Sequence, residues 1–170
     1  SSFLNVYIFL LAVMIPPGIE LATVLFGCLR AGAVAVLIDA GLGPKGMHAA
    51  VRLAAPEVLV GVPAALGAAR TLSWSGRRVS VEPLSAAKRR ALGVHADLST
   101  GGDAAIPLPP PPGREDAAAV VFTSGATGPS KGVTYTHRQL EAQRDALRQL
   151  YAITGQDRLV AAFAPFAIYG

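Results

Sequence analysis

Four side chains that can bind a phosphate group lie within one short stretch of the sequence. They provide three hydroxyl groups and one ammonium group: Thr123, Ser124, Thr127 and Lys131. Glycines are interspersed among them: Gly125, Gly128 and Gly132. Because glycine lets backbone N–H groups approach an anion closely, and because lysine offers a full positive charge to phosphate oxygens, this combination predicts a phosphate-binding loop.

The elements around this stretch are those that would hold such a loop in place. The apolar run Ala118–Phe122 has the length and β-branched content of a buried strand, and Val120–Phe122 is expected to be a central strand of a sheet. A loop over Thr123–Gly132 would follow at the carboxyl end of that strand. Thr136 and Gln139 then have the spacing of a capping box, which predicts that a helix begins immediately after Thr136.

Two other interpretations of the stretch fit less well. The Walker phosphate loop requires Gly-Lys-Ser/Thr, whereas Lys131 is preceded by Ser130 and followed by Gly132. A surface turn rich in glycine and hydroxyl residues predicts neither the lysine nor the strand before it.

A second glycine-rich stretch suggests a different cofactor. Gly41–Gly46 matches the G-x-G-x-x-G pattern after an expected strand, which is the fingerprint of a Rossmann-type dinucleotide-binding module. That fingerprint requires glycines immediately after the strand and an acidic residue about 20 positions later. Here Asp39 and Ala40 intervene, and Glu57 comes early and begins a strand. The dinucleotide module is therefore the less favoured alternative.

Strands and helices are expected to alternate along the first part of the chain. The expected elements are strands at 8–15, 33–38 and 57–62 and helices at 18–31, 44–55 and 63–70. Gly32 stands where the first helix would end. This alternation is typical of α/β proteins, so the predicted fold is a mostly parallel sheet flanked by helices.

Two further segments complete the expected fold. Residues 71–116, which include four consecutive prolines at 109–112, are predicted to form a less regular connector. The helix after Thr136 is expected to run to about Ile153, and a last strand is expected at 158–163. The inner face of that helix is expected to consist of Leu140, Leu147, Leu150 and Tyr151.

The composition indicates a folded protein without a nucleic-acid surface. The chain is 52% hydrophobic and 15% charged, and its net charge of +4 comes mostly from scattered arginines. The basic residues cluster only at Arg77-Arg78 and Lys88-Arg89-Arg90. Aromatic residues are not interleaved with these clusters, so a solvated basic face is favoured and no nucleic-acid partner is expected.

One cysteine and one interrupted apolar run bear on the compartment. A single cysteine, Cys28, excludes an internal disulfide, and its place on an apolar helix face indicates a buried thiol. The apolar run Phe3–Ile15 is short for a membrane span, two prolines follow it, and a longer span would bury Glu20. No membrane span and no signal peptide are therefore expected, and the expected location is cytoplasmic.

Two stretches resemble motifs of a known superfamily. Phe122–Val133 is similar to the ATP-phosphate loop of adenylate-forming enzymes, whose usual pattern is Thr-Ser-Gly-(Ser/Thr)-Thr-Gly-x-Pro-Lys-Gly; Ala126 and Ser130 depart from it. Leu29–Asp39 looks like a second motif of these enzymes, with Leu37 in place of the usual proline. The resemblance implies an acetyl-CoA-synthetase-like fold.

The same resemblance implies a carboxylate-activating enzyme. In this superfamily a substrate carboxylate attacks the α-phosphorus of ATP and gives an acyl-adenylate and pyrophosphate, so ATP and Mg²⁺ are the expected cofactors. The loop would bind the β- and γ-phosphates through Thr123, Ser124, Gly125, Thr127, Gly128, Lys131 and Gly132.

Complete members of the superfamily are much longer than this chain. Residues 1–170 are therefore expected to be a partial N-terminal, AMP-binding domain. In complete members the adenine-binding motif, the ribose-binding aspartate and the catalytic lysine come later in the sequence. No catalytic residue and no metal ligand is expected within residues 1–170, which alone should not catalyse adenylation.

Three short matches indicate one group within the superfamily. Leu37–Gly43, Val60–Pro63 and Pro165–Ala167 resemble the olefin β-lactone synthetases, which adenylate a β-hydroxy acid and let its own hydroxyl displace AMP. Phe166 and Tyr169 would line the entry of the carboxylate substrate, so the expected substrate is a long-chain fatty or β-hydroxy acid. A fatty-acyl-CoA or fatty-acyl-AMP ligase is left open, and in the first of these coenzyme A would be a further partner.

Overall fold

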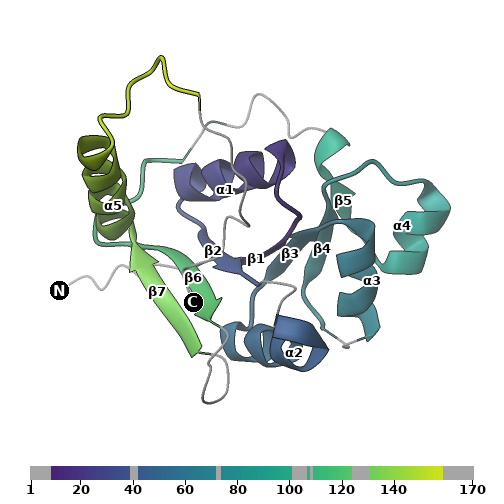
Figure 1. Ribbon diagram of the computed structural model, residues 1–170. Coiled ribbons are helices and arrows are strands. Elements are labelled where there is room, and N and C mark those ends of the chain that lie inside the picture. Colours follow the sequence, from purple (N-terminus) through teal and green to yellow (C-terminus); the bar gives the residue numbers. More distant parts are fainter. Residues whose placement is uncertain are drawn as a thin grey trace.

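The described residues form one seven-stranded sheet with helices on both faces (Figure 1). The computed structural model describes residues 9–38, 42–71, 74–100, 107, 109–123 and 131–158. Its strands are β1 (Leu10–Met14), β2 (Val34–Leu37), β3 (Val58–Gly61), β4 (Arg77–Ser80), β5 (Ala96–Asp97), β6 (Ala117–Thr123) and β7 (Lys131–Thr136). Its helices are α1 (Ile19–Ala31), α2 (Gly43–Ala54), α3 (Pro63–Thr71), α4 (Ala86–Leu92) and α5 (His137–Leu150), with a 3₁₀ turn at Leu98–Thr100.

The strands of the described part are arranged in the order β5-β4-β3-β1-β2-β6-β7. Neighbouring strands from β5 to β6 run parallel, and only the last pair, β6 and β7, is antiparallel. The predicted α/β fold with a mostly parallel sheet is confirmed.

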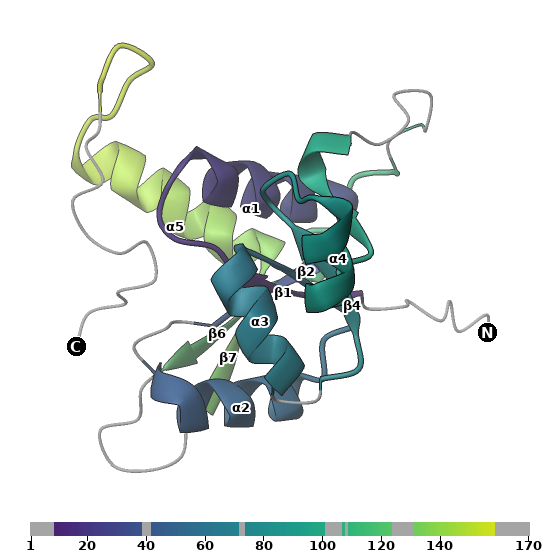
Figure 2. The same ribbon diagram turned by 90° about the vertical axis from the view of Figure 1, so that its right-hand side faces the viewer.

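Two apolar clusters bury the two faces of the sheet. Ala12 belongs to a cluster shared with α2 and α3, whereas its neighbour Val13 belongs to a cluster shared with α1. Successive strand residues point to opposite faces, so a strand covered on both sides must be apolar at every position. Figure 2 shows α2 and α3 on one side of the sheet and α1 on the other.

The predicted end of the first helix is confirmed. Gly32 caps α1 with φ 70°, in the left-handed region that favours glycine. The N–H of Ala33 donates to the carbonyl of Cys28 over 3.0 Å, and β2 begins at the next residue. This tight turn accounts for the order of helix, glycine and apolar strand in 29–38.

Residues 71–116 are more regular than the sequence predicts. Instead of a plain connector, this segment contains strands β4 and β5, which extend the sheet at one edge, and helix α4 between them. The prolines at 109–112 return the chain to β6, and Pro109 accepts a hydrogen bond of 2.9 Å from Arg30 of α1. Helix α4 has no buried residue, so its sequence carries no apolar periodicity to reveal it.

The prediction that the strand before the phosphate-loop stretch is central in the sheet is wrong. Strand β6 is the sixth of the seven strands, and its neighbours are the parallel β2 and the antiparallel β7. Val121 and Phe122 are nevertheless buried, and Phe122 packs in the cluster shared with α2 and α3.

Helix α5 begins where the sequence predicts, but its expected inner face is wrong. The capping box between Thr136 and Gln139 is present. Leu147, Leu150 and Tyr151 are 45%, 73% and 68% exposed, because no described element packs against that side of the helix. Capping is a local property that the sequence determines, whereas burial depends on what other segments cover.

The apolar run near the start of the sequence contains one strand. Its described residues include β1, and α1 begins only at Ile19, after the two prolines. Across the part of the chain that the structure describes, no helix is both long enough and apolar enough to span a bilayer.

The cysteine is buried, as predicted, and this leads to a testable expectation. Burial raises the pKa of the Cys28 thiol to about 11, because the thiolate loses hydration inside α1. At about pH 8.5 we expect iodoacetamide to alkylate Cys28 in the native protein at least about 100-fold more slowly than in urea. Mass spectrometry after timed exposure measures both rates, and equal rates would contradict the burial of this thiol.

Candidate functional site

The phosphate-loop stretch closes a β-hairpin. In the pairing of β6 with β7, Thr123 lies opposite Lys131 and Phe122 lies opposite Gly132. The loop is therefore shorter than predicted, because its two ends already belong to strands. Four of the predicted phosphate-binding residues, Ser124, Gly125, Thr127 and Gly128, lie outside the described residues.

The two described ends of the hairpin loop are held together by the sheet. Strand β6 runs parallel to β1 and β2, so Thr123 lies at the edge where the carboxyl ends of those strands also lie. Ligands of open α/β sheets bind outside this edge. The hairpin therefore presents Lys131 at the part of the fold where a ligand is expected.

The charge of Lys131 is available to a ligand. Lys131 is an exposed residue at the first position of β7. Among the described residues, the ion pairs are made by Arg89, Arg114, Arg138 and Arg144, and not by Lys131. An ammonium group without a carboxylate partner fits a phosphate ligand, with which it can form charge-assisted hydrogen bonds.

Gly132 allows β7 to approach the aromatic residue beneath it. A Cβ atom at Gly132 would lie 3.1 Å from Cγ1 of Val120 and 3.3 Å from Cε1 of Phe122. The backbone of Gly132 is not in the left-handed region, so glycine is needed here for space and not for a turn. The sequence indicated only a general role in shaping the loop.

A turn before β6 fixes the helix that follows β7. The carbonyls of Asp116 and Arg114 accept hydrogen bonds from His137 N–H over 3.1 Å and from Arg138 N–H over 2.7 Å. These are free N–H groups of the first turn of α5, so the turn satisfies donors that the helix itself cannot. The Asp116 carboxylate accepts a 2.7 Å hydrogen bond from Gly113 N–H, which closes the turn.

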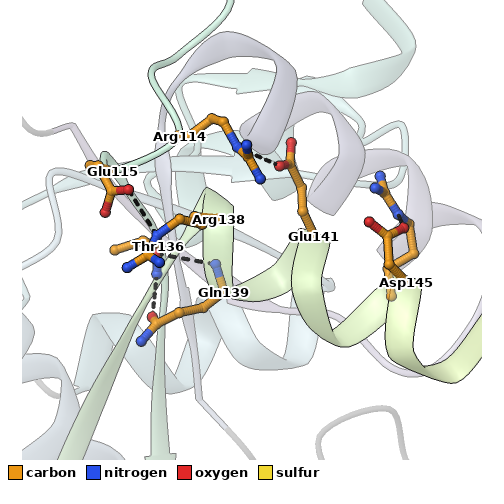
Figure 3. Close-up of polar contacts among 8 residues, drawn as sticks. Arg114, Glu115, Thr136, Arg138, Gln139, Glu141 and Asp145 are labelled. Carbon is orange, nitrogen blue, oxygen red and sulfur yellow. Dashed lines mark hydrogen bonds and ion pairs between the residues drawn. The ribbon is translucent and has the colours of Figure 1, made fainter.

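Two ion pairs and the capping box complete this attachment (Figure 3). Arg114 pairs with Glu141 at 3.0 Å, and Arg138 pairs with Glu115 at 2.8 Å. Two residues of the turn, Arg114 and Glu115, therefore form ion pairs with α5. Exposed pairs of this kind contribute about 0–1 kcal/mol each, so they orient α5 more than they stabilise it. Sequence analysis missed these four residues, since no local spacing rule links positions so far apart.

The remaining site predictions cannot be placed in the structure. Phe166 and Tyr169, the expected substrate residues, lie outside the described residues, as does Gly41 of the dinucleotide-like stretch. Within the ranges that the structure describes, no three His, Cys, Asp or Glu side chains are grouped so that they could hold a metal ion.

A cavity of about 500 Å³ lined by His48, Arg52 and Trp74 lies at the amino ends of β3 and β4, at the edge away from the hairpin loop.

Comparison with known proteins identifies similar sequences and a similar fold. Residues 10–170 match the family described as AMP-binding enzyme. Two olefin β-lactone synthetases, from Xanthomonas campestris pv. campestris and Stenotrophomonas maltophilia, are 30% and 31% identical over 157 and 159 residues. Each alignment covers 92% of this chain, and the chain spans only 28% of the length of either relative.

A solved structure shows the same fold. The crystal structure of ATP-bound MatB from Rhodopseudomonas palustris superposes with a TM-score of 0.69 at 21% sequence identity. The superposition covers 94% of this chain and 31% of that protein.

Proposed function

The chain belongs to the AMP-binding enzyme family, and from this premise we propose that the protein activates a carboxylic acid with ATP, forming an acyl-adenylate and pyrophosphate. The observation that carries the proposal is the β6–β7 hairpin, which presents Lys131 at the carboxyl edge of the parallel sheet, with no ion pair to any of the described residues. Lys131, Thr123, Gly132 and the loop residues between them would bind the β- and γ-phosphates.

The reaction requires that the negative charge of the triphosphate be neutralised, because the attacking nucleophile is itself a carboxylate. A carboxylate and a triphosphate repel each other, so the two must be held in line while phosphate charge is compensated. Lys131 would neutralise part of that charge and leave the α-phosphorus open to attack. When bound, Mg²⁺ supplies further neutralisation of the phosphate oxygens.

The proposed substrate is a long-chain β-hydroxy acid, and the proposed product is a β-lactone. Support comes from the identity of 30% and 31% with two olefin β-lactone synthetases. In this reaction the substrate's own hydroxyl oxygen attacks the acyl carbon, a C–O bond forms, and AMP leaves. A long-chain acyl-CoA ligase is the rival, in which the thiol of coenzyme A attacks the same carbon.

One product analysis distinguishes the two outcomes. The complete protein is incubated with ATP, Mg²⁺ and a long-chain β-hydroxy acid, with and without coenzyme A, and the lipids are examined by mass spectrometry. We expect a β-lactone in both reactions. An acyl-CoA that forms only with coenzyme A, without any β-lactone, would contradict the proposed product and favour the ligase.

A further inference from the structure

The cavity at the amino ends of β3 and β4 lies at the opposite edge of the sheet from the hairpin loop. Its volume is about 500 Å³, and helix α2 ends beside it. Sites for small molecules have volumes of about 300–1,000 Å³ and combine apolar walls with a few polar groups. We call this space the amino-edge cavity, and its lining decides whether it is such a site.

The floor of the amino-edge cavity is apolar. Val51, Pro56 and Trp74 line it. The same three side chains also line a second space on the core side, together with the buried Ala12 and Leu59. That second space has a volume of only about 10 Å³, which is too small for more than a single water. A ligand in the cavity would therefore lie on this floor and not enter the core.

The indole ring of Trp74 is held in one position on this floor. A Cβ atom at Gly76 would collide with the six-membered ring of Trp74, so the ring lies against the backbone of residue 76. Nη2 of Arg78 donates to the Trp74 carbonyl over 2.6 Å, and the Arg78 guanidinium lies 5.9 Å from the ring centre. The backbone N–H of Trp74 donates to the carbonyl of Ala69 over 3.3 Å. Because the ring is already ordered, a ligand that contacts it avoids the entropic cost of ordering it.

Charged side chains of both signs line the same cavity. Arg52 lies in the last turn of α2, and Glu57 immediately precedes β3. His48 lines the cavity one turn before Arg52, on the same face of α2. Arg52 and Glu57 are both exposed, and within the described ranges neither forms an ion pair with the other or with any third residue. Both charges are therefore available to a ligand.

A cation and an anion above an apolar floor are complementary to a zwitterion. A ligand carboxylate would accept two parallel hydrogen bonds from the Arg52 guanidinium, and a ligand ammonium would donate to the Glu57 carboxylate. A ligand with only one charge would leave either Arg52 or Glu57 facing a like charge, which costs binding energy.

We propose that the amino-edge cavity binds a zwitterionic ligand with an apolar side chain, which is the chemistry of an apolar amino acid or of a short peptide of such residues. The side chain would lie on the floor beside Trp74, between Arg52 and Glu57. The proposal does not rest on the proposed carboxylate activation, because Lys131 lies at the carboxyl edge of the sheet. A ligand in the amino-edge cavity leaves that edge accessible.

Three probes that share a phenyl group and differ in charge test this proposal. Phenylalanine is a zwitterion, phenylpropanoate has only the carboxylate, and phenethylamine has only the ammonium group. Their binding to the complete protein is followed by the fluorescence of Trp74, the one tryptophan of residues 1–170. The signal is the difference between the wild type and Trp74→Phe, so that any tryptophan elsewhere cancels. We expect phenylalanine to bind at least about tenfold more tightly than either singly charged probe.

A fourth probe distinguishes the two sources of such a ligand. The dipeptide alanyl-phenylalanine has the same phenyl group and the same two charges, but the charges are farther apart. Tighter binding of the dipeptide than of phenylalanine would identify a peptide as the ligand, and the reverse order would identify an amino acid.

Two substitutions separate the two charges of the cavity. Arg52→Gln should weaken the binding of phenylalanine and phenylpropanoate at least about tenfold without weakening that of phenethylamine. Glu57→Gln should weaken the binding of phenylalanine and phenethylamine without weakening that of phenylpropanoate. Arg148→Gln on α5 and Glu82→Gln after β4 change the net charge equally and should leave every affinity within about twofold of the wild type. Circular dichroism establishes that each variant is folded.

Three results would overturn the proposal. If phenylalanine bound no more tightly than phenylpropanoate or phenethylamine, the cavity would use only one of its two charges. If Arg52→Gln and Arg148→Gln gave equal losses, the probes would respond to net charge and not to this cavity. If no probe changed the fluorescence of Trp74 or released heat in isothermal titration, the cavity would not bind a zwitterion of this class.

Discussion

Replacing Lys131 with alanine should weaken the binding of Mg²⁺–ATP by roughly 10- to 100-fold, since hydrogen bonds to charged groups are among the strongest in proteins. The exposed ammonium group at the start of β7 has no carboxylate partner among the described residues, so its loss leaves no internal charge unpaired. The fold should therefore be unaffected. Isothermal titration of the complete protein with Mg²⁺–ATP measures the change.

A matched control separates a local effect from a change in net charge. Arg148→Ala removes one exposed positive charge from α5, the helix that follows the hairpin. This variant should bind ATP as the wild type does. An affinity of Lys131→Ala within about twofold of that of Arg148→Ala would contradict the phosphate-binding role of Lys131.

Replacing Phe122 with alanine should lower the free energy of unfolding by about 3–5 kcal/mol. The ring is 5% exposed, belongs to the cluster beneath α2 and α3, and lies against Gly132 of the opposite strand. Truncation would leave a cavity at the point where the hairpin begins. Urea denaturation followed by circular dichroism measures the loss.

The chain offers an exposed counterpart for this change. Phe26 on α1 is 71% exposed, so Phe26→Ala should change the free energy of unfolding by less than about 0.5 kcal/mol. Phe122→Leu, which retains more of the buried volume, provides a milder variant in case Phe122→Ala does not fold. If Phe122→Leu and Phe122→Ala were no less stable than Phe26→Ala, the packing described here would be wrong.

The sequence predicted the first half of the fold because its signals are local. β1, β2 and β3 are apolar on both faces, and α1 ends at a glycine with positive φ. Each of these features depends on residues close together in the chain. The predicted ends of these elements differ from the observed ones by only a few residues.

The sequence did not reveal α4 or β7, for two different physical reasons. Helix α4 lacks a buried face, and the signals that were available are its caps: Ser85 accepts a hydrogen bond from Lys88 N–H over 3.4 Å, and Gly93 has φ 62°. Strand β7 is exposed along most of its length. Only Val133 and Tyr135 alternate with polar residues in it, which is too short a pattern to predict a strand. The pairing of β7 with β6 was not predicted either, because the composition of the loop between them indicates a ligand site and not the turn of a hairpin.

Among the site predictions, the ends of the loop can be judged and its centre cannot. Lys131 and Gly132 lie at the base of the hairpin, where the register places them opposite Thr123 and Phe122. The roles of Ser124 and Thr127 stay predictions. The anchoring turn at 113–116 was missed because its contacts to α5 join segments that no sequence periodicity connects.

The most direct test of the central claim is exchange of labelled pyrophosphate into ATP by the complete protein. Activation of a carboxylate is reversible up to the acyl-adenylate, so a carboxylate must be present for the label to enter ATP. We predict exchange with a long-chain β-hydroxy acid, none without an acid, and a large loss in Lys131→Ala. If the folded wild-type protein bound ATP but gave no exchange with long-chain acids, or if Lys131→Ala exchanged at the wild-type rate, the account would be contradicted.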